Sequence, residues 1–143
     1  MRLSWNEVRA RAAKFARDHA DDKDERSQSQ RFWIDFFDIF GLDSRRVTTF
    51  EKRVQQLEAA KRGFIDLFWP GTLIVEQKSA GRDLLAATKQ ALDYFDWLPE
   101  KERPRYILVC DFQRFRLTDL GDGREWAFQL ADLPKHVEAF AFI

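Results

Sequence analysis

The stretch GFIDLFWPGTLIVEQK, residues 63–78, decides the fold of this 143-residue chain. Two apolar runs, FIDLFW and TLIVEQK, flank a Pro-Gly pair, and each run is too short for a helix. The pattern predicts a β-hairpin whose strands are buried on both faces. Its charged residues do not fit an ordinary core, because Asp66, Glu76 and Lys78 are of types that are almost never fully buried without a partner.

The length of the hairpin loop decides whether these charges meet. Side chains two apart share a face of a strand, so Glu76 and Lys78 point the same way. In a two-residue turn, Asp66 pairs with Val75 and faces away from Glu76. In a three-residue loop over residues 70–72, with its central glycine at positive φ, Asp66 lies opposite Glu76. Only this second register brings two carboxylates and a lysine together.

Two opposed carboxylates repel each other unless a cation lies between them, and one lysine offsets only part of the repulsion. A Mg²⁺ ion held by Asp66, Glu76 and the backbone carbonyl of Gln77 would bind a phosphate oxygen and a water. Lys78 would then orient or help deprotonate that water and stabilise charge on the phosphorane. The residues therefore predict metal-dependent phosphodiester hydrolysis, in which Mn²⁺ substitutes for Mg²⁺. The alternative is a buried ion-pair cluster that only fixes the register of the strands.

The composition fits one soluble domain over residues 1–143. The chain is 45% hydrophobic and 15% aromatic, which supplies a core, and it is 34% charged with a net charge of zero. This balance argues against nucleic-acid binding by bulk charge alone. The single cysteine, Cys110, excludes an intramolecular disulfide and is expected to be a small buried hydrophobic residue. With no apolar run of membrane-spanning length and no secretory leader, we expect a cytoplasmic protein.

The other elements alternate between helices and strands. Amphipathic helices are predicted over residues 4–20, with Ser4 and Glu7 as a capping box, and in ERSQSQRFWIDFFDIFG, which Gly41 ends. Another helix is predicted over residues 82–98, followed by the strands RYILVCDF, RFRLTDL and EWAFQL and by the start of a helix in LPKHVEAFAFI. This order predicts an α/β fold with a mixed central β-sheet and helices on both faces.

Three motifs, GFID, VEQK and QALDY, resemble in order and spacing those of the PD-(D/E)XK nuclease superfamily. Gln90 and Tyr94 match the QxxxY motif of its RecB-like branch, and their spacing puts them on one side of the predicted helix. Taken alone, this pair would be ordinary helix-boundary residues. The stretch RGFIDLFWPGTLIVEQKSAGRDL further resembles the N-terminal nuclease domain of MmeI-like (type IIL/IIG) restriction–modification enzymes, most strongly over residues 62–96.

The resemblance implies an activity and a set of residues. The activity is that of a type II restriction endonuclease that uses Mg²⁺ to cut double-stranded DNA. The implied catalytic residues are Asp66, Glu76, Lys78, Gln90 and Tyr94, and Asp66, Glu76 and the Gln77 carbonyl are the implied metal ligands. The leading helix of the superfamily often supplies another carboxylate, for which Glu25 is the candidate and a solvated helix end the alternative. The resemblance also favours a strand over Val47–Leu57, whose own propensities are mixed.

Family members continue into a helical spacer, a methyltransferase domain that uses S-adenosylmethionine, and a target-recognition domain. None of these fits in 143 residues, and no NPPY-type methyltransferase motif is present. The resemblance therefore implies an N-terminal fragment of a fused enzyme that serves phage defence in a bacterial or archaeal cell.

Two other functions remain open from the sequence. One is a non-catalytic DNA-binding or scaffold domain, against which the intact charged motif argues. The other is a nuclease that acts on RNA or on branched DNA. Arg82, Lys89 and the KRG run at 61–63 are candidate phosphate contacts, whereas His19 and His136, near predicted helix ends, are expected on the surface.

Overall fold

The computed structural model describes residues 3–55 and 65–143, in which helices and strands alternate along the chain. The α-helices are α1 (Trp5–Asp18), α2 (Glu25–Ile39), α3 (Ser44–Gln55) and α4 (Leu84–Leu92). The strands are β1 (Leu67–Trp69), β2 (Leu73–Gln77), β3 (Tyr106–Cys110), β4 (Arg114–Asp119) and β5 (Glu125–Gln129). Short 3₁₀ helices are η2 (Phe95–Trp97), η3 (Glu100–Glu102), η4 (Leu130–Lys135) and η5 (Val137–Phe140).

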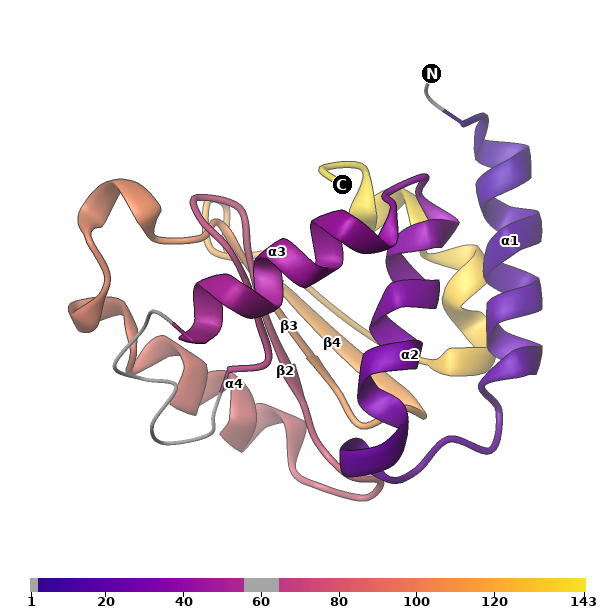
Figure 1. Ribbon diagram of the computed structural model, residues 1–143, viewed down its shortest axis with the longest axis horizontal. Helices are drawn as coiled ribbons and strands as arrows, with labels where there is room; N and C mark the ends of the chain where they lie inside the picture. Colours follow the sequence, from indigo (N-terminus) through magenta and orange to yellow (C-terminus); the bar gives the residue numbers. More distant parts are fainter. Residues whose placement is uncertain (1–2, 56–64) are drawn as a thin grey trace.

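The five strands form one mixed sheet in the order β1-β2-β3-β4-β5. Strands β2 and β3 are parallel, and the other neighbours are antiparallel. Helix α4 lies in the connection between the two parallel strands, as such a crossover requires. Helices α1, α2 and α3 lie on one side of the sheet and α4 on the other (Figure 1). The predicted α/β fold with a mixed central sheet is confirmed.

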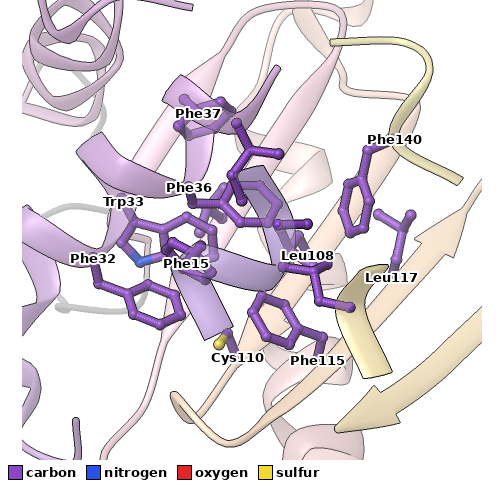
Figure 2. Close-up of a cluster of buried hydrophobic side chains, with 14 of the residues drawn as sticks. Phe15, Phe32, Trp33, Phe36, Phe37, Leu108, Cys110, Phe115, Leu117 and Phe140 are labelled. Carbon is purple, nitrogen blue, oxygen red and sulfur yellow. The ribbon is translucent and has the colours of Figure 1, made fainter. Parts of the chain in front are cut away.

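The larger core lies between the sheet and helices α1, α2 and α3. Helix α2 contributes four aromatic residues with consecutive spacings of one, three and one, which cover one broad face of the helix (Figure 2): Phe32, Trp33, Phe36 and Phe37. They meet Phe15 from α1, Leu108 and Cys110 from β3, and Phe115 from β4. The expected burial of Cys110 is confirmed, since it is fully buried.

A smaller core lies on the opposite face of the sheet. Ile74 from β2 and Val109 from β3 pack there against Leu84, Ala87 and Ala91 of α4. Side chains therefore alternate along β2 between the two cores, and this strand is buried along its whole length. No helix within residues 3–55 and 65–143 is long and apolar enough to cross a membrane.

The segment over Val47–Leu57 is helical, so the predicted strand is wrong. Within α3, the buried residues Val47, Phe50 and Val54 recur at helical spacing. The β-branched Thr48 and Thr49 are exposed, and their hydroxyls donate to backbone carbonyls four residues earlier. Packing of the apolar stripe thus outweighs the strand propensity of VTTF. The last two residues of the predicted strand lie outside the described residues.

Two other helix predictions need correction: one helix was predicted too long, and another segment was predicted as the wrong type of helix. Helix α4 covers Leu84–Leu92 instead of residues 82–98, because the Tyr94 amide donates to the Ala91 carbonyl three residues earlier and tightens the last turn. The C-terminal segment forms η4 and η5 rather than an α-helix. Pro134 lies inside η4, and its missing N–H and its ring are incompatible with a continuous α-helix.

The hairpin has the three-residue loop. Its register pairs Leu67 with Val75 and Trp69 with Leu73, which leaves residues 70–72 as the loop. Gly71 at the centre has φ +75°, and its amide donates to the Glu102 carbonyl at 2.9 Å. This is the register that the sequence required for the charges to meet.

Gly71→Ala should destabilise the fold by about 1 kcal/mol, because an L-residue is strained at positive φ. A Cβ there would meet the Lys101 carbonyl at 3.7 Å, an ordinary contact, so the cost would come from the backbone alone. Gly71→Asn is the matched control, since asparagine tolerates this region better and should recover part of the loss. Urea denaturation of the three proteins measures the difference, and equal stability would contradict a left-handed Gly71.

Candidate active site

The strand ladder ends just before the first carboxylate. The Asp66 amide donates to the Val75 carbonyl at 2.9 Å, although Val75 already pairs with Leu67. Asp66 then accepts, through Oδ2, from the Gln77 amide at 2.7 Å. The Asp66 side chain thus takes the place that a backbone carbonyl would occupy in a continued ladder. Asp66 therefore lies outside the ladder and is not a regular cross-strand partner of Glu76, although its charge is close enough to contribute to the raised pKa of Glu76.

Glu76 is the most unusual residue of the sheet. It lies on the α4 face with Ile74 and is 1% exposed. Lys78 Nζ lies 3.0 Å from Glu76 Oε1, so the two form an ion pair. Within the described part of the chain the Lys78 ammonium is the partner of Glu76, and neither Glu76 oxygen accepts a well-aligned hydrogen bond from another group. A buried carboxylate of this kind is costly unless another group binds it.

Burial also changes the acidity of both carboxylates. Desolvation raises the pKa of Glu76 to about 7, opposed by the Lys78 ammonium and reinforced by the negative charges of Asp66 and Glu25. Desolvation likewise raises the pKa of Asp66 to about 6, opposed by the hydrogen bond from the Gln77 amide. Asp66 is exposed as a residue, so its desolvation reflects protein atoms around the carboxylate rather than full burial.

A pocket of about 260 Å³ opens between the start of α2, the end of β2 and one side of α4. Glu25, Lys78 and Gln90 line it together with Arg82, Asp83, Ala86 and Ala87. Glu25 is the first residue of α2 and is half-buried, so it does not behave as a fully solvated helix end. The structure therefore brings Glu25, Lys78 and Gln90, from three distant segments, to one pocket.

Tyr94 is placed differently from Gln90. Because α4 ends at Leu92, Tyr94 belongs to the following turn, and its side chain is 4% exposed within the smaller core. Gln90 is exposed and lines the pocket. Gln90 lines the pocket together with Lys78, and Tyr94 is buried in the smaller core; the joint projection of both side chains toward the two carboxylates stays a prediction.

The Gln77 side chain has a structural task that sequence reasoning missed. It points to the α2 side of the sheet, where its Oε1 accepts from Trp33 Nε1 at 3.0 Å. Its Nε2 donates to the Lys78 carbonyl at 2.9 Å. The buried amide thus ties α2 to the end of β2 and fixes the backbone between the two charged residues. The Gln77 carbonyl as a metal ligand remains a prediction.

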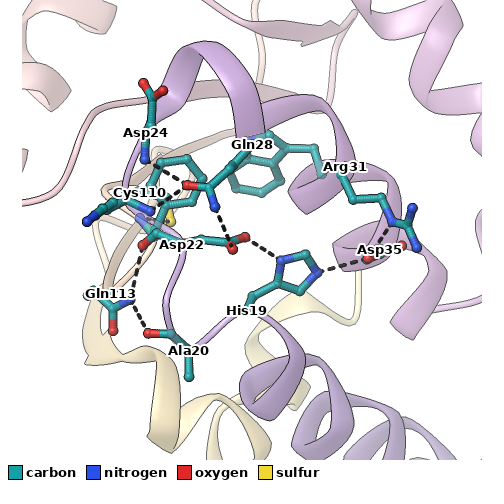
Figure 3. A network of polar contacts seen from close by, with 12 residues as sticks. His19, Ala20, Asp22, Asp24, Gln28, Arg31, Asp35, Cys110 and Gln113 are labelled. Atoms are coloured by element: carbon teal, nitrogen blue, oxygen red, sulfur yellow. Dashed lines mark hydrogen bonds and ion pairs between the residues drawn. The ribbon is translucent and has the colours of Figure 1, made fainter.

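A polar network holds the loop that precedes Glu25 (Figure 3). Contrary to the surface position predicted for it, His19 is 5% exposed and contacts Asp22 through Nδ1 and Asp35 through Nε2, the latter at 2.9 Å. Gln28 Oε1 accepts from two loop amides, and Gln113 Nε2 donates to two loop carbonyls. The spacing of His19 four residues after Phe15, on the apolar stripe of α1, was the sequence signal for its burial.

The same loop touches the segment that follows β2. The Ala80 amide donates to the Lys23 carbonyl at 3.3 Å, and the Gly81 amide donates to Asp111 Oδ2 at 3.1 Å. The network around His19 therefore holds the loop before Glu25 against the segment that follows β2. His136, also predicted on the surface, is partly buried and stacks on Phe128.

The carboxylate oxygens around Glu76 are of the kind that bind a hard cation such as Mg²⁺, but they are few. The free acceptors are carboxylate oxygens of Glu76, beside those of Asp66, and Mg²⁺ prefers such oxygens. Among residues 3–55 and 65–143, no group of three or more His, Cys, Asp or Glu side chains is arranged to hold a metal. A metal here would need backbone, water or substrate oxygens in addition to the two carboxylates.

Comparison with known families gives one match. The family described as "MmeI, N-terminal domain" matches residues 9–143, which is most of the chain. No curated protein and no solved structure matches.

The raised pKa of Glu76 predicts a pH-dependent stability. Below about pH 4.5 the carboxyl is protonated in both states; as the pH rises to about 7, the unfolded state ionises first and stability is lost. The expected loss is on the order of 3 kcal/mol, since each unit of pKa difference corresponds to about 1.4 kcal/mol. Asp66 acts in the same direction, with a folded pKa of about 6.

Glu76→Gln should remove most of this loss, so that the variant becomes more stable than the parent above pH 7. Glu125→Gln, at an exposed carboxylate on β5, is the control and should leave the pH profile unchanged. Urea unfolding from pH 4 to 8 measures all three proteins. A parallel profile for the parent and Glu76→Gln would show that Glu76 is not the titrating group.

Proposed function

The chain belongs to the MmeI N-terminal domain family, and from this premise we propose that it is the Mg²⁺-dependent DNA endonuclease module of a fused restriction–modification enzyme. Family membership associates the chain with restriction–modification enzymes. The observation that best supports a nuclease is Glu76, a buried carboxylate that pairs with Lys78, lies near Asp66 and accepts no well-aligned hydrogen bond from any other described residue.

The carboxylates are the proposed metal-binding groups. Asp66 and Glu76 would hold the ion together with the Gln77 carbonyl, and Glu25 would approach from the start of α2. A bound Mg²⁺ supplies Lewis-acid polarisation of a phosphate oxygen. This arrangement also accounts for the cost of Glu76, because a cation would replace the missing hydrogen-bond donors and return the carboxylate to its ionised form.

Lys78 is the proposed positioning group for water and phosphate. It follows β2 directly, and its side chain is 23% exposed, so its ammonium reaches the pocket while contacting Glu76. An ammonium there donates hydrogen bonds to an attacking water or to a non-bridging phosphate oxygen. It also offsets the negative charge that develops on the phosphate during attack.

Gln90 and Tyr94 take different parts in this proposal. Gln90 presents an exposed amide to the pocket, where its N–H groups can donate to a phosphate oxygen. Tyr94 packs in the smaller core at the end of α4 and would support the helix that carries Gln90. The proposed partner is double-stranded DNA, and the spacer, methyltransferase and target-recognition domains would be supplied by the full enzyme.

Metal binding is the first test of the site. Titration of the chain with Mn²⁺ should give saturable binding and a higher melting temperature. Asp66→Ala and Glu76→Ala should each weaken binding at least tenfold, whereas Glu138→Ala, at an exposed position on η5, should not. Calorimetry in two buffers at pH 6 should also show proton release, because the folded pKa values are about 6 and 7. Equal binding by the parent and both site variants would contradict the metal site.

Cleavage by the full restriction–modification enzyme is the second test. Lys78→Ala should abolish cutting while DNA methylation and Mn²⁺ binding persist. Gln90→Ala should lower the cleavage rate at least tenfold, equivalent to about 1.4 kcal/mol in the barrier. Tyr94→Ala should instead destabilise the fold by roughly 3 kcal/mol, in line with removal of a buried aromatic residue. A stable Tyr94→Ala enzyme that fails to cut would return Tyr94 to the catalytic set.

A further inference from the structure

A groove of about 580 Å³ crosses the α4 side of strands β4 and β5. The start of α4 forms one wall and the two strands form the floor. Arg82, Asp83, Leu85, Arg114, Arg116 and Ala127 are among the residues that line it. Every second residue of β5 is exposed toward this side, namely Glu125, Ala127 and Gln129. The groove is therefore an open face of the sheet beyond the part that α4 covers.

The groove is continuous with the pocket of the candidate active site. Arg82 and Asp83 line both. The strand register also connects the groove to Glu76. One row of paired residues runs across the sheet from Glu76 to Val109, Arg116 and Ala127. Paired residues point to the same face, so Glu76 and Arg116 share one face two strands apart, at a Cα separation of about 10 Å.

Arginines dominate the lining of the groove although the chain is neutral overall. Arg82, Arg114 and Arg116 line it, and the carboxylates near them are engaged: Asp83 is the N-cap of α4 through the Ala86 amide, Asp111 pairs with Arg114, and Glu125 pairs with Arg116. Arg114 is preorganised, because Asp111 accepts from its Nε and Nη2 and the Arg82 carbonyl accepts from Nη2. Arg116 is half-buried, with 21% of its side chain exposed, and pairs with the exposed Glu125 at 2.8 Å, a carboxylate partner that a phosphate oxygen could replace.

Arginines in an open groove fit the backbone of a nucleic acid better than an acidic peptide. A guanidinium matches a phosphate through two parallel hydrogen bonds, and phosphates follow each other every 3.4 Å or so of helix axis along one strand. A separation of about 10 Å between Glu76 and Arg116 puts Arg116 within reach of phosphates a few nucleotides from the scissile one. A strand whose scissile phosphate lay at Lys78 would carry its neighbouring phosphates past Arg82 toward Arg116.

We propose that this groove binds the sugar–phosphate backbone of DNA on one side of the scissile phosphate, with Arg82, Arg114 and Arg116 as its phosphate contacts. The proposal rests on the proposed nuclease function, since it assigns the path of that substrate. It gives the groove no role in sequence recognition, because phosphate contacts fix the position of the DNA and do not read its bases.

The experiment measures binding of a labelled DNA duplex by the 143-residue chain without divalent metal, between about 50 and 200 mM salt. Arg82→Ala and Arg116→Ala should each raise Kd about five- to tenfold and lower the slope of log Kd against log salt by about one. Arg9→Ala is the charge-matched control, because Arg9 on α1 also pairs with an exposed glutamate, Glu138, and lies outside the groove. It should leave the slope unchanged.

A second pair of variants changes the charge of the groove while every arginine side chain stays in place. Ala127→Glu places a carboxylate on the groove floor opposite Arg116 and should weaken DNA binding, whereas Ala131→Glu, exposed on η4, should not. The proposal is overturned if the chain binds no DNA, if both controls weaken binding as much as the groove variants, or if the arginines serve an RNA duplex in preference to DNA. These experiments measure DNA binding and not cleavage. A negative result would therefore overturn the groove proposal, whereas the nuclease function is tested separately by the Lys78 variant and by metal binding.

Discussion

Strand β2 must serve two environments at once, because successive side chains of a strand point to opposite faces. Leu73, Val75 and Gln77 point toward the core under α1, α2 and α3, while Ile74 and Glu76 point toward α4. The strand is buried along its length, so no residue of β2 can turn to solvent. The three-residue loop around Gly71 therefore fixes the environment of each residue that follows it.

A buried carboxylate survives in this position because its surroundings are rigid. Glu76 is flanked by the paired strand β3 and contacts only one cation among the described residues, so burial raises its pKa to about 7. Such a carboxylate is costly to bury, and in the proposed site a bound cation would offset that cost. The hydrogen bond from Trp33 to Gln77 and the network around His19 hold α2, with Glu25 at its start, against this strand end.

The positions of the charged residues say more about DNA binding than the net charge of the chain does. A net charge of zero excludes binding by bulk attraction, yet three arginines face one open groove next to the candidate active site. Two of them lie on β4 and the third in the loop before α4, segments that come together only in the tertiary structure. Acidic residues near the arginines are engaged, Asp83 as a helix cap and Asp111 as a buried ion-pair partner.

The sequence alone determined the elements whose signals are local. The capped helix α1, the existence of the hairpin and the three later strands follow from short periodic patterns and turn residues. The sequence also singled out Asp66, Glu76 and Lys78 as charges in an apolar stretch, but it left two loop lengths open, and only the strand register decided for three residues. Packing decided the rest. The stripe of Val47, Phe50 and Val54 made a helix where propensity was divided, and α4 ended at Leu92, which left Tyr94 in the following turn and buried in the smaller core. Whether His19 is buried, whether Asp66 stays in the ladder and which arginines share a groove depend on contacts between segments far apart in the chain, and a local pattern contains no information about those contacts.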